Sequence, residues 1–401
     1  MSLIVQKFGG SSVADRDKIL NVADIATQTF SAGNDVVVVL SAQGDTTDDL
    51  LAKAAEINKN PTTREMDMLL STGEQISISL LAMAIQSLGF PVISLTGWQI
   101  GLKTDSNYSS ARIKSLTNSR IQEELANRRI VIVAGFQGIN KSEDITTLGR
   151  GGSDTTAVAL AAQLRADLCQ IYTDVDGIYT ADPRKIKNAK KLDNISFDEM
   201  LELATMGAQV LHNRSVELAK RYNVNLEVLS SFSRLPGTIV KENDKMEKML
   251  VRGIAKDEDV AVIELIDVND IPGIAFKVFS LIANKKISID IILQSTGRNG
   301  NRDISFTIAK KHIQEAVSAL DELKPVLGFT EVAVNDNIAK ISIVGTGMIN
   351  NAGIASSMFE ALSNNNINIQ MISSSEIKIS VLIDKQDADR AVQAIHDQFF
   401  D

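Results

Sequence analysis

A lysine followed by a glycine-rich turn opens the sequence and has the residue types of an anion-binding site. Lys7 to Ser12 reads KFGGSS, in which Gly9 and Gly10 let the backbone approach a ligand closely and Ser11 adds a hydroxyl donor. The helix expected from about Asp15 offers its N-terminus to an anion, and the lysine places a positive charge where a polyphosphate would sit. The alternative is an ordinary tight turn between a strand and a helix.

A second polar loop and a single acidic residue extend the candidate site. Val39 to Asp48 reads VLSAQGDTTD, and its Ser41 and Thr47 are suited to bind phosphate or carboxylate, although Asp48 could equally cap a helix. Glu74, in the stretch STGEQ, lies near the start of a long apolar helix. It is either a partner for a substrate ammonium or a first-turn charge favoured by the helix dipole. Both interpretations stay open at this point.

The segment GRGGSDTT, Gly149 to Thr156, combines a guanidinium with many small residues before an alanine-rich helix. Arg150 can bind a carboxylate with two hydrogen bonds, and the amides of Gly151, Gly152 and Ser153 lie beside it in sequence. Asp154 can orient a lysine or a metal-bound phosphate. A loop with so many small residues contributes little to packing, which favours a binding site.

A fourth polar segment, Thr173 to Arg184, reads TDVDGIYTADPR. Its D-x-D-G run resembles a calcium loop but lacks the third oxygen position and the bidentate glutamate, so we exclude that reading. Tyr179 can lie beside a nucleotide base and Arg184 can neutralise phosphates. In contrast, the sequence VGTGMIN at Val344 to Asn350 resembles a dinucleotide fingerprint only partly, since its third glycine position is asparagine.

Short apolar runs alternate with amphipathic ones over the first 235 or so residues, which predicts an α/β domain with a mainly parallel sheet. In such sheets the ligand site lies at the carboxyl ends of the strands, where the four polar segments would meet. The expected strands are Leu3–Phe8, Asp35–Leu40, Pro91–Leu95, Arg129–Ala134 and Leu168–Thr173, and the expected helices include Asp48–Asn58, Met66–Leu88 and Asp154–Gln163.

The remainder of the chain repeats itself at a constant offset of 80 residues. Ile271–Phe279 (IPGIAFKVF) matches Asn351–Phe359 (NAGIASSMF), and further matches follow at 284/364, 287/367, 289/369, 292/372 and 295/375. Each copy predicts a β-α-β-β-α-β unit, and two copies are too few for a solenoid. We expect domain boundaries at 1–235, 236–258 (a linker and leading strand), 259–337 and 338–401.

Composition excludes several classes of function. The chain has 401 residues and a net charge of −9, and only 4% of its residues are aromatic, so it is a poor candidate for binding nucleic acid or an anionic membrane. Cys169 is the single cysteine and the three histidines lie far apart, which argues against a thiolate or histidine metal site. The N-terminal MSLIVQKFGG carries no long apolar region, so we expect a cytoplasmic protein.

Taken in this order, the four segments and Ser71–Glu74 closely resemble the aspartate kinases of the amino-acid kinase family, and the repeats resemble two ACT domains. The resemblance spans essentially the whole chain. It implies a three-layer α/β sandwich followed by two ferredoxin-like domains. It also implies transfer of the γ-phosphoryl of ATP, with Mg²⁺ on the phosphates, to the side-chain carboxylate of L-aspartate.

The resemblance also implies roles for individual residues. Lys7 would stabilise the transferring phosphoryl, and Asp154 would hold that lysine in place. Arg150 and Glu74 would fix the carboxylate and ammonium of the substrate, with help from Thr47 and from the amides of 151–153. The nucleotide would contact Gly9, Gly10, Ser11, Ser41, Thr173, Asp174, Tyr179, Asp182 and Arg184. Gln209 stands where many members of the family have lysine, and Ser11 where threonine is common.

Two ACT domains imply feedback control by lysine, threonine or both, and a homodimer or larger assembly. The effector site would include Asp270, Gly273, Ala275, Asp290, Gln294, Asn368 and Ile369. The nearest alternative function is a sibling kinase acting on N-acetylglutamate or glutamate. A catalytically silent amino-acid sensor is an alternative from a different class.

Overall fold

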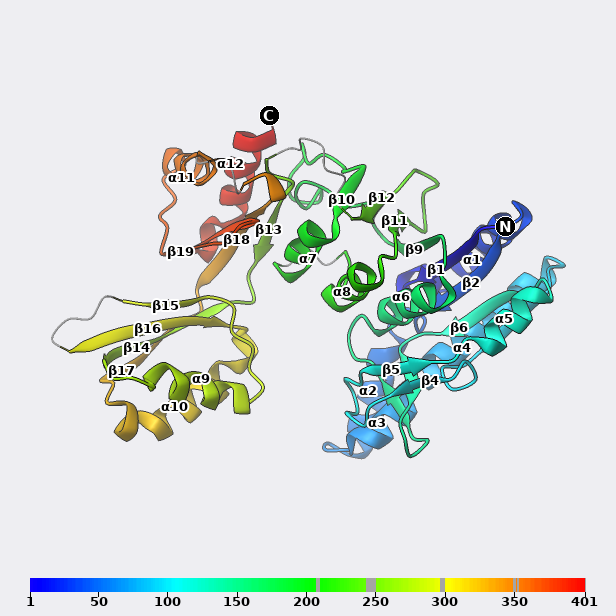
Figure 1. Cartoon of the computed structure of the whole chain (residues 1–401), viewed down its shortest axis with the longest axis horizontal. Coiled ribbons are helices and arrows are strands. Elements are labelled where there is room, and N and C mark those ends of the chain that lie inside the picture. Colours follow the sequence, from blue (N-terminus) through cyan, green and yellow to red (C-terminus); the bar gives the residue numbers. More distant parts are fainter. Residues whose placement is uncertain (207–209, 243–249, 296–299, 349–350, 352, 401) are drawn as a thin grey trace. The chain divides into compact units, whose positions relative to one another are not determined.

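The computed structural model describes residues 1–206, 210–242, 250–295, 300–348, 351 and 353–400. The chain divides into two compact units (Figure 1). Met1–Thr180 and Lys190–Met246 form the first unit, and Ala181–Ala189 and Glu247–Asp401 form the second.

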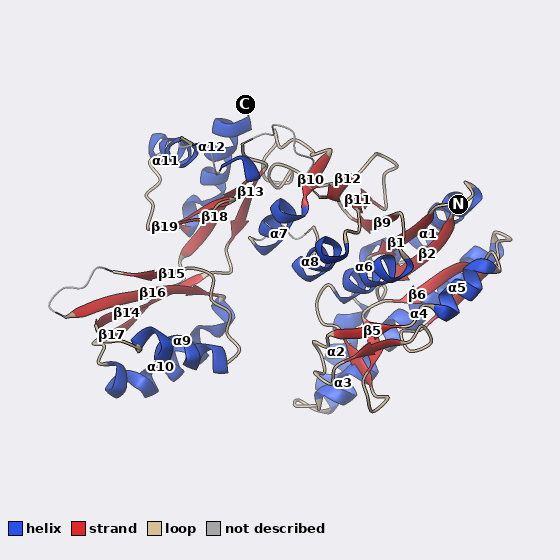
Figure 2. Ribbon diagram, in the orientation of Figure 1, coloured by secondary structure: helices blue, strands red, loops and turns tan. Residues whose placement is uncertain are grey.

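The first unit is built on an eight-stranded sheet, visible in Figure 2. Its neighbouring strands run parallel except for the antiparallel pair β11 and β12. The strand order is β10 (Asn194–Ser196), β12 (Thr238–Lys241), β11 (Leu226–Ser230), β9 (Leu168–Thr173), β1 (Leu3–Phe8), β2 (Asp35–Leu40), β6 (Ile130–Ala134) and β3 (Val92–Leu95). The predicted strands are therefore confirmed, with the third and fourth each beginning one residue later.

Helices cover both faces of this sheet, which gives three layers. The helices α1 (Arg16–Ser31) and α4 (Thr72–Ser87) pack together on one face, and α6 (Gly152–Leu164) packs on β1, β2 and β9. Against α6 lies α8 (Asn213–Tyr222), which also contacts α7 (Phe197–Thr205). Because successive side chains of a strand point to opposite faces, Phe8 enters the core with α1 and α4 while Lys7 faces the other side.

A smaller sheet lies beside the carboxyl ends of these strands. It has the order β5 (Ile113–Leu116), β4 (Leu102–Thr104), β7 (Gln137–Ile139) and β8 (Ile145–Thr147). The helix α3 (Thr63–Leu70) packs on β8, while α2 (Thr46–Ile57) contacts α3 and α5 (Ser119–Ala126) contacts β6.

Two helix predictions need correction. The single helix expected over Met66–Leu88 is two helices, α3 and α4, which meet at Ser71. Asp48 is not a helix cap, because α2 begins at Thr46 and Asp48 lies in its first turn. By length and composition alone the stretch 63–87 could span a membrane, yet half of its most apolar window is buried inside the protein. This burial is typical of a core helix.

The second unit holds two antiparallel four-stranded sheets, one for each sequence repeat. The first repeat is a complete β-α-β-β-α-β unit. It comprises β14 (Ala261–Asn269), α9 (Ile274–Asn284), β15 (Ile292–Gln294), β16 (Asn301–Ile308), α10 (Ile313–Leu327) and β17 (Glu331–Asn335). The edge strand β17 pairs with β14, and the helices pack on one face of the sheet over an apolar core.

The second repeat receives its fourth strand from another part of the chain. It comprises β18 (Ile338–Val344), α11 (Ile354–Asn364), β19 (Met371–Ser374), β20 (Lys378–Asp384) and α12 (Ala388–Phe400). The strand β13 (Gly253–Asp257) precedes the first repeat in sequence but pairs antiparallel with β18. This confirms the expected fold class, and it places the leading strand of 236–258 in the second repeat.

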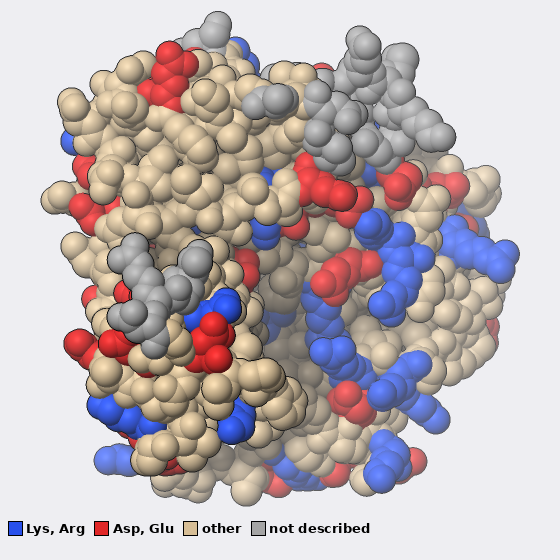
Figure 3. Space-filling model, turned by 60° about the vertical axis from the view of Figure 1, so that its left-hand side comes forward, with Lys and Arg blue, Asp and Glu red and all other residues tan. Residues whose placement is uncertain are grey.

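Acidic and basic side chains are interspersed on the face of the molecule drawn in Figure 3. The exposed ion pairs of the protein include Lys220 with Asp198 and Arg234 with Asp24. Exposed pairs of this kind contribute little to stability, about 0–1 kcal/mol each.

Candidate active site

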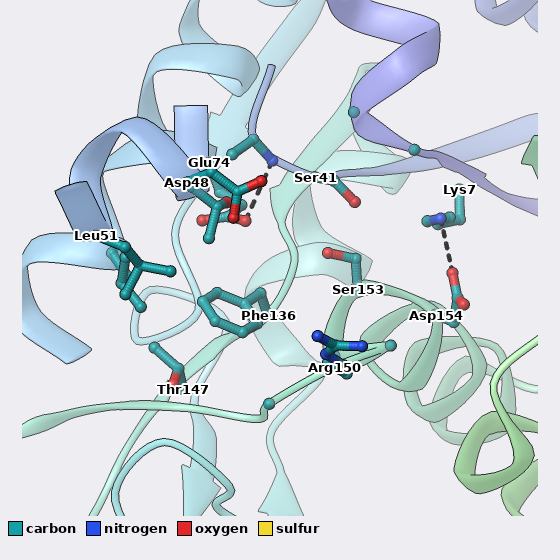
Figure 4. A pocket seen from close by; sticks show the side chains of 18 of the residues that line it. Lys7, Ser41, Asp48, Leu51, Glu74, Phe136, Thr147, Arg150, Ser153 and Asp154 are labelled. Atoms are coloured by element: carbon teal, nitrogen blue, oxygen red, sulfur yellow. Dashed lines mark hydrogen bonds and ion pairs between the residues drawn. The ribbon is translucent and has the colours of Figure 1, made fainter. Parts of the chain in front are cut away.

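A cavity of about 700 Å³ lies in the first unit, where β1, β2 and β6 end (Figure 4). Three of the four polar segments and Glu74 contribute to it. Among the predicted residues it is lined by Lys7, Gly9, Gly10, Ser41, Thr47, Glu74, Arg150, Gly151, Gly152, Ser153 and Asp154. Residues from positions 7 to 154 thus meet in one place because the carboxyl ends of parallel strands share one edge of the sheet.

Lys7 and Asp154 form an ion pair within this cavity. Lys7 Nζ lies 2.7 Å from Asp154 Oδ1, and both side chains are only 12% exposed. The lysine points to the face of β1 that α6 covers, and Asp154 lies in the first turn of α6. The carboxylate therefore fixes the position of the ammonium, which leaves the lysine able to donate further hydrogen bonds to an anion.

The glycine-rich turn after β1 packs tightly against the loop after β2. The amide of Gly44 donates to the carbonyl of Gly10 at 3.0 Å. A Cβ atom at position 10 would lie only 2.7 Å from the carbonyl oxygen of Ala42, so the turn requires glycine there. Ser11 follows in a short 3-10 helix and is exposed, and it does not line the cavity.

Glu74 is a buried carboxyl group in the first turn of α4. Its Oε1 accepts a hydrogen bond from the amide of Ala42 at 3.1 Å. Its Oε2 is buried and has no hydrogen-bond partner among the described residues. Burial raises the pKa of Glu74 to about 8. A buried oxygen that lacks a partner and belongs to a cavity-lining residue favours the ligand interpretation over a plain helix-dipole role.

The turn that carries Arg150 is shaped by two glycines in the left-handed region. Gly149 has φ of 78° and Gly151 has φ of 66°. A Cβ atom at position 151 would lie 2.3 Å from Cγ of His212, so the turn packs directly on that ring. Arg150 is exposed at the cavity beside Ser153, as Figure 4 shows. An exposed guanidinium at the mouth of a cavity can bind a carboxylate.

Other residues around the cavity lay outside the sequence-based predictions. Phe136 follows β6, Thr147 ends β8, and Ser109 and Leu51 complete the wall with further neighbours. The sequence carries a signal for Thr147, which lies two residues before the glycine turn that begins at Gly149. Ser109 carries no comparable signal, because only the tertiary fold brings its loop to the cavity.

The predicted nucleotide segment lies apart from the cavity lining. Thr173 ends β9, which pairs with β1, and its hydroxyl donates to Asp174 at 3.0 Å. The Tyr179 hydroxyl donates to Asp176 at 2.8 Å, and burial and this bond raise the pKa of Tyr179. None of Thr173, Asp174 and Tyr179 lines the cavity.

Asp182 and Arg184 belong to the segment 181–189, which packs with the second unit. The Arg184 side chain donates to Asp182 at 3.0 Å. Gln209, whose role was an open question, lies outside the described residues. Among the described residues, no group of three histidine, cysteine or acidic side chains could hold a metal ion.

The predicted effector residues lie in the two repeats of the second unit. Asp270 pairs with Arg302 at 2.7 Å, and Asp290 pairs with Lys340 at 2.5 Å. Gly273 precedes α9 with φ of 90°. Ala275, Gln294 and Asn368 are exposed, whereas Ile369 is half-buried against the core of the second repeat.

Comparison with known proteins agrees with this geometry. Residues 2–230 match the amino acid kinase family, and residues 266–323 and 341–399 match the ACT domain. The aspartokinase of Mycolicibacterium smegmatis is 51% identical over 405 residues, covering all of this chain and 96% of the relative. That of Corynebacterium glutamicum is 50% identical with the same coverage.

Solved structures give the same result. Aspartokinase III of E. coli in complex with aspartate and ADP, in the R-state, is 28% identical and superposes with a TM-score of 0.84 over all of both chains. The same enzyme with lysine and aspartate, in the T-state, gives 0.76. The chain therefore belongs to the aspartokinases of the amino acid kinase family, and it carries two ACT domains.

Proposed function

We propose that this chain transfers the γ-phosphoryl of ATP to the side-chain carboxylate of L-aspartate, giving 4-phospho-L-aspartate and ADP. The observation that supports this most is the meeting of the Lys7–Asp154 pair with Arg150 and Glu74 around one cavity. Such a cavity offers cations for phosphate and carboxylate, together with one buried carboxylate for an ammonium. The aspartate and ADP bound by E. coli aspartokinase III agree with this substrate pair.

The chemistry needs charge compensation more than a base. ATP and a dicarboxylate repel one another, so the site must supply cations and backbone amides. Lys7 stabilises the charge on the transferring phosphoryl, and Asp154 holds its ammonium in place. The attacking carboxylate has a reference pKa of about 3.9 and is ionised at neutral pH, so no general base is required.

Substrate orientation falls to the other residues of the cavity. Arg150 binds a carboxylate of aspartate, and Ser153 and Thr47 add hydroxyl donors. Glu74 receives the α-ammonium at its Oε2, which has no hydrogen-bond partner among the described residues. An N-acetylated substrate would bring an amide in place of that ammonium, which argues for a free amino acid.

For the nucleotide we propose the glycine turn at 9–11, Ser41, and the segment after β9 with Thr173, Asp174, Tyr179, Asp182 and Arg184. Mg²⁺ enters with ATP as a phosphate-bound ion. Magnesium is usually held by phosphates and one or two carboxylates and rarely by a protein cage.

We further propose that lysine, threonine or both act through the two ACT repeats, that the chain forms a homodimer or larger assembly, and that it works in the cytoplasm. The T-state structure of E. coli aspartokinase III contains lysine, which supports an amino-acid effector.

The test is ADP release by the purified chain with MgATP and one acceptor at a time. We expect turnover with L-aspartate and none above background with L-glutamate or N-acetyl-L-glutamate, while Lys7→Met serves as the control for contaminating ATPase. Turnover with N-acetyl-L-glutamate alone would identify the sibling kinase. Effector binding without ADP release from any acceptor would identify the silent sensor.

A further inference from the structure

Two segments at the mouth of the cavity are joined by side chains distant in sequence. One is the loop 105–112, which contributes Ser109 to the cavity, and the other is the stretch 147–151, which carries Arg150. Ala111 donates its amide to the carbonyl of Thr147 at 2.9 Å, so the two segments already touch. Asp67 and Arg214 bind four further backbone groups of these two segments.

Asp67 accepts hydrogen bonds from one backbone amide of each segment. It lies on α3 with no exposed surface and accepts the amides of Ser109 at 2.9 Å and Thr147 at 2.8 Å. The hydroxyl of Thr147 donates to the other oxygen of the carboxylate at 2.8 Å. A fully buried carboxylate is costly unless hydrogen bonds satisfy it, and both oxygens here are satisfied by residues that line the cavity.

Arg214 donates hydrogen bonds to one backbone carbonyl of each segment. It lies in the first turn of α8, and its guanidinium donates to the carbonyls of Leu148 and Ala111, both at 2.9 Å. Burial lowers the pKa of Arg214, with Arg112 adding to the effect. His212 caps α8 and packs on Gly151, so the start of this helix contacts the Arg150 turn at two points.

We propose that Asp67 and Arg214 are a pair of positioning residues that set where Arg150 meets the substrate carboxylate. The Arg150 side chain makes no hydrogen bond or ion pair with any described residue, so its placement depends on the backbone of its turn. Asp67 fixes the amide of Thr147, and Arg214 fixes the carbonyl of Leu148, the residue directly before the turn. The inference rests on the proposed function, since it assumes that Arg150 binds aspartate.

The pair does not touch the substrate, because neither residue lines the cavity. Its effect should therefore appear in aspartate binding and not in ATP binding. A displacement of about 1 Å at a positioned group can cost about 100-fold in rate, so loss of one anchor of the turn is expected to be measurable.

The experiment measures kcat and both KM values for Arg214→Met, Arg214→Lys, Asp67→Asn and Arg150→Ala in the full chain. We expect Arg214→Met to raise the KM for L-aspartate about 10-fold and the KM for MgATP by less than about 2-fold. Arg214→Lys should recover part of the loss, because an ammonium can still reach one carbonyl. Asp67→Asn should resemble Arg214→Met.

Arg128→Met is the matched control. Arg128 pairs with Asp35 where β2 begins, at the end of the strands opposite the cavity. The Arg128→Met variant should therefore have an unchanged KM for aspartate. Thermal melting of each variant separates a loss of folded protein, which lowers the active fraction, from a change in KM. If Asp67→Asn fails to fold, the Arg214 series alone decides.

The double variant Arg150→Ala/Arg214→Met provides the decisive comparison. If Arg214 acts through Arg150, the double variant has the same KM for aspartate as Arg150→Ala alone. Full additivity of the two effects overturns the inference, as does an unchanged KM in Arg214→Met. An unchanged KM in Arg150→Ala itself would reject the substrate contact of the proposed function, and the positioning role with it.

Discussion

Lys340, on β18 of the second repeat, places its ammonium 2.5 Å from the carboxylate of Asp290 in the first repeat. The lysine side chain is 4% exposed and also lies 3.5 Å from Asp257 at the end of β13. Asp290 is one of the residues expected at the effector site, and its carboxylate is suited to bind the ammonium of an amino acid. An ammonium from the chain itself already stands there, so effector and Lys340 would compete for one carboxylate.

Removal of the Lys340 ammonium should therefore allow the effector to inhibit at a lower concentration. We expect Lys340→Met to lower the half-inhibitory concentration of lysine or threonine by about 3-fold, a small change because Asp290 is partly exposed and screened. Asp290→Asn should raise it. The measurement is inhibition of ADP release, with Lys256→Met as control, because Lys256 pairs with Glu258 and Asp389 instead. Equal inhibition of all variants would show that Asp290 is not part of the effector site.

The raised pKa of Glu74 predicts a pH dependence of substrate binding. An ammonium prefers the ionised carboxylate, whose population grows as the pH rises toward about 8. The KM for L-aspartate should fall by up to about 10-fold per pH unit between about pH 6.5 and about pH 8. In Glu74→Gln the KM should be higher and independent of pH over this range. An equal slope in both proteins would show that another group titrates.

The same carboxyl group predicts the sign of a stability change. Its pKa in the folded chain, about 8, lies above the ordinary value of 4.5, so folding favours the protonated form. The resulting stabilisation is complete below pH 4.5 and is lost as the pH rises through about 8. Denaturant unfolding across this range should therefore give a steeper decline for the parent chain than for Glu74→Gln. A steeper decline in the variant would contradict the assignment.

Lys7 should affect the chemical step more than binding. Loss of one preorganised donor to developing negative charge typically costs 100- to 1,000-fold in kcat, and we expect about that for Lys7→Met. The variant also leaves Asp154 without its ion pair, so thermal melting must accompany the kinetics. Lys7→Arg keeps the charge and should retain more activity. A kcat within about 10-fold of the parent for Lys7→Met would exclude the proposed role.

Gly151 is predicted to be intolerant of even a methyl group. Its φ is 66°, and a Cβ atom there would collide with His212 at 2.3 Å. We expect Gly151→Ala to lower the free energy of unfolding by about 2–4 kcal/mol. Gly33→Ala is the matched control, because Gly33 has φ of 92° with no atom within 4 Å of the added carbon. It should cost only about 1–2 kcal/mol, the backbone strain alone. Equal losses would show that contact with His212 is unimportant.

Much of the first unit could be predicted because hydrophobic runs determine buried strands. Leu3–Phe8, Asp35–Leu40 and Leu168–Thr173 were predicted to the residue, since each ends at a polar or glycine residue. Helix ends were less certain. The helix predicted from Met66 to Leu88 passes through the polar stretch Ser71–Gln75. The structure breaks the helix there, with α3 packed on β8 and α4 on α1.

Residues that act through the backbone were missed. Asp67 reads as a surface charge on a helix, although a lone carboxylate in the apolar run MDMLL was a signal for burial. Arg214 reads as an exposed helix residue, because nothing local indicates that Leu148 and Ala111 lie within its reach. The pairing of β13 with β18 of the second repeat could not be predicted from the sequence either, since strand pairing depends on contacts between distant segments.

Hydroxylamine trapping tests the central claim most directly, because an acyl phosphate on a carboxylate reacts with hydroxylamine to give a hydroxamate. Purified chain with MgATP, L-aspartate and hydroxylamine should form aspartyl hydroxamate in equal amount to ADP, and Lys7→Met and Arg150→Ala should each reduce both products together. ADP released without hydroxamate, or hydroxamate formed equally well from L-glutamate, would contradict the account.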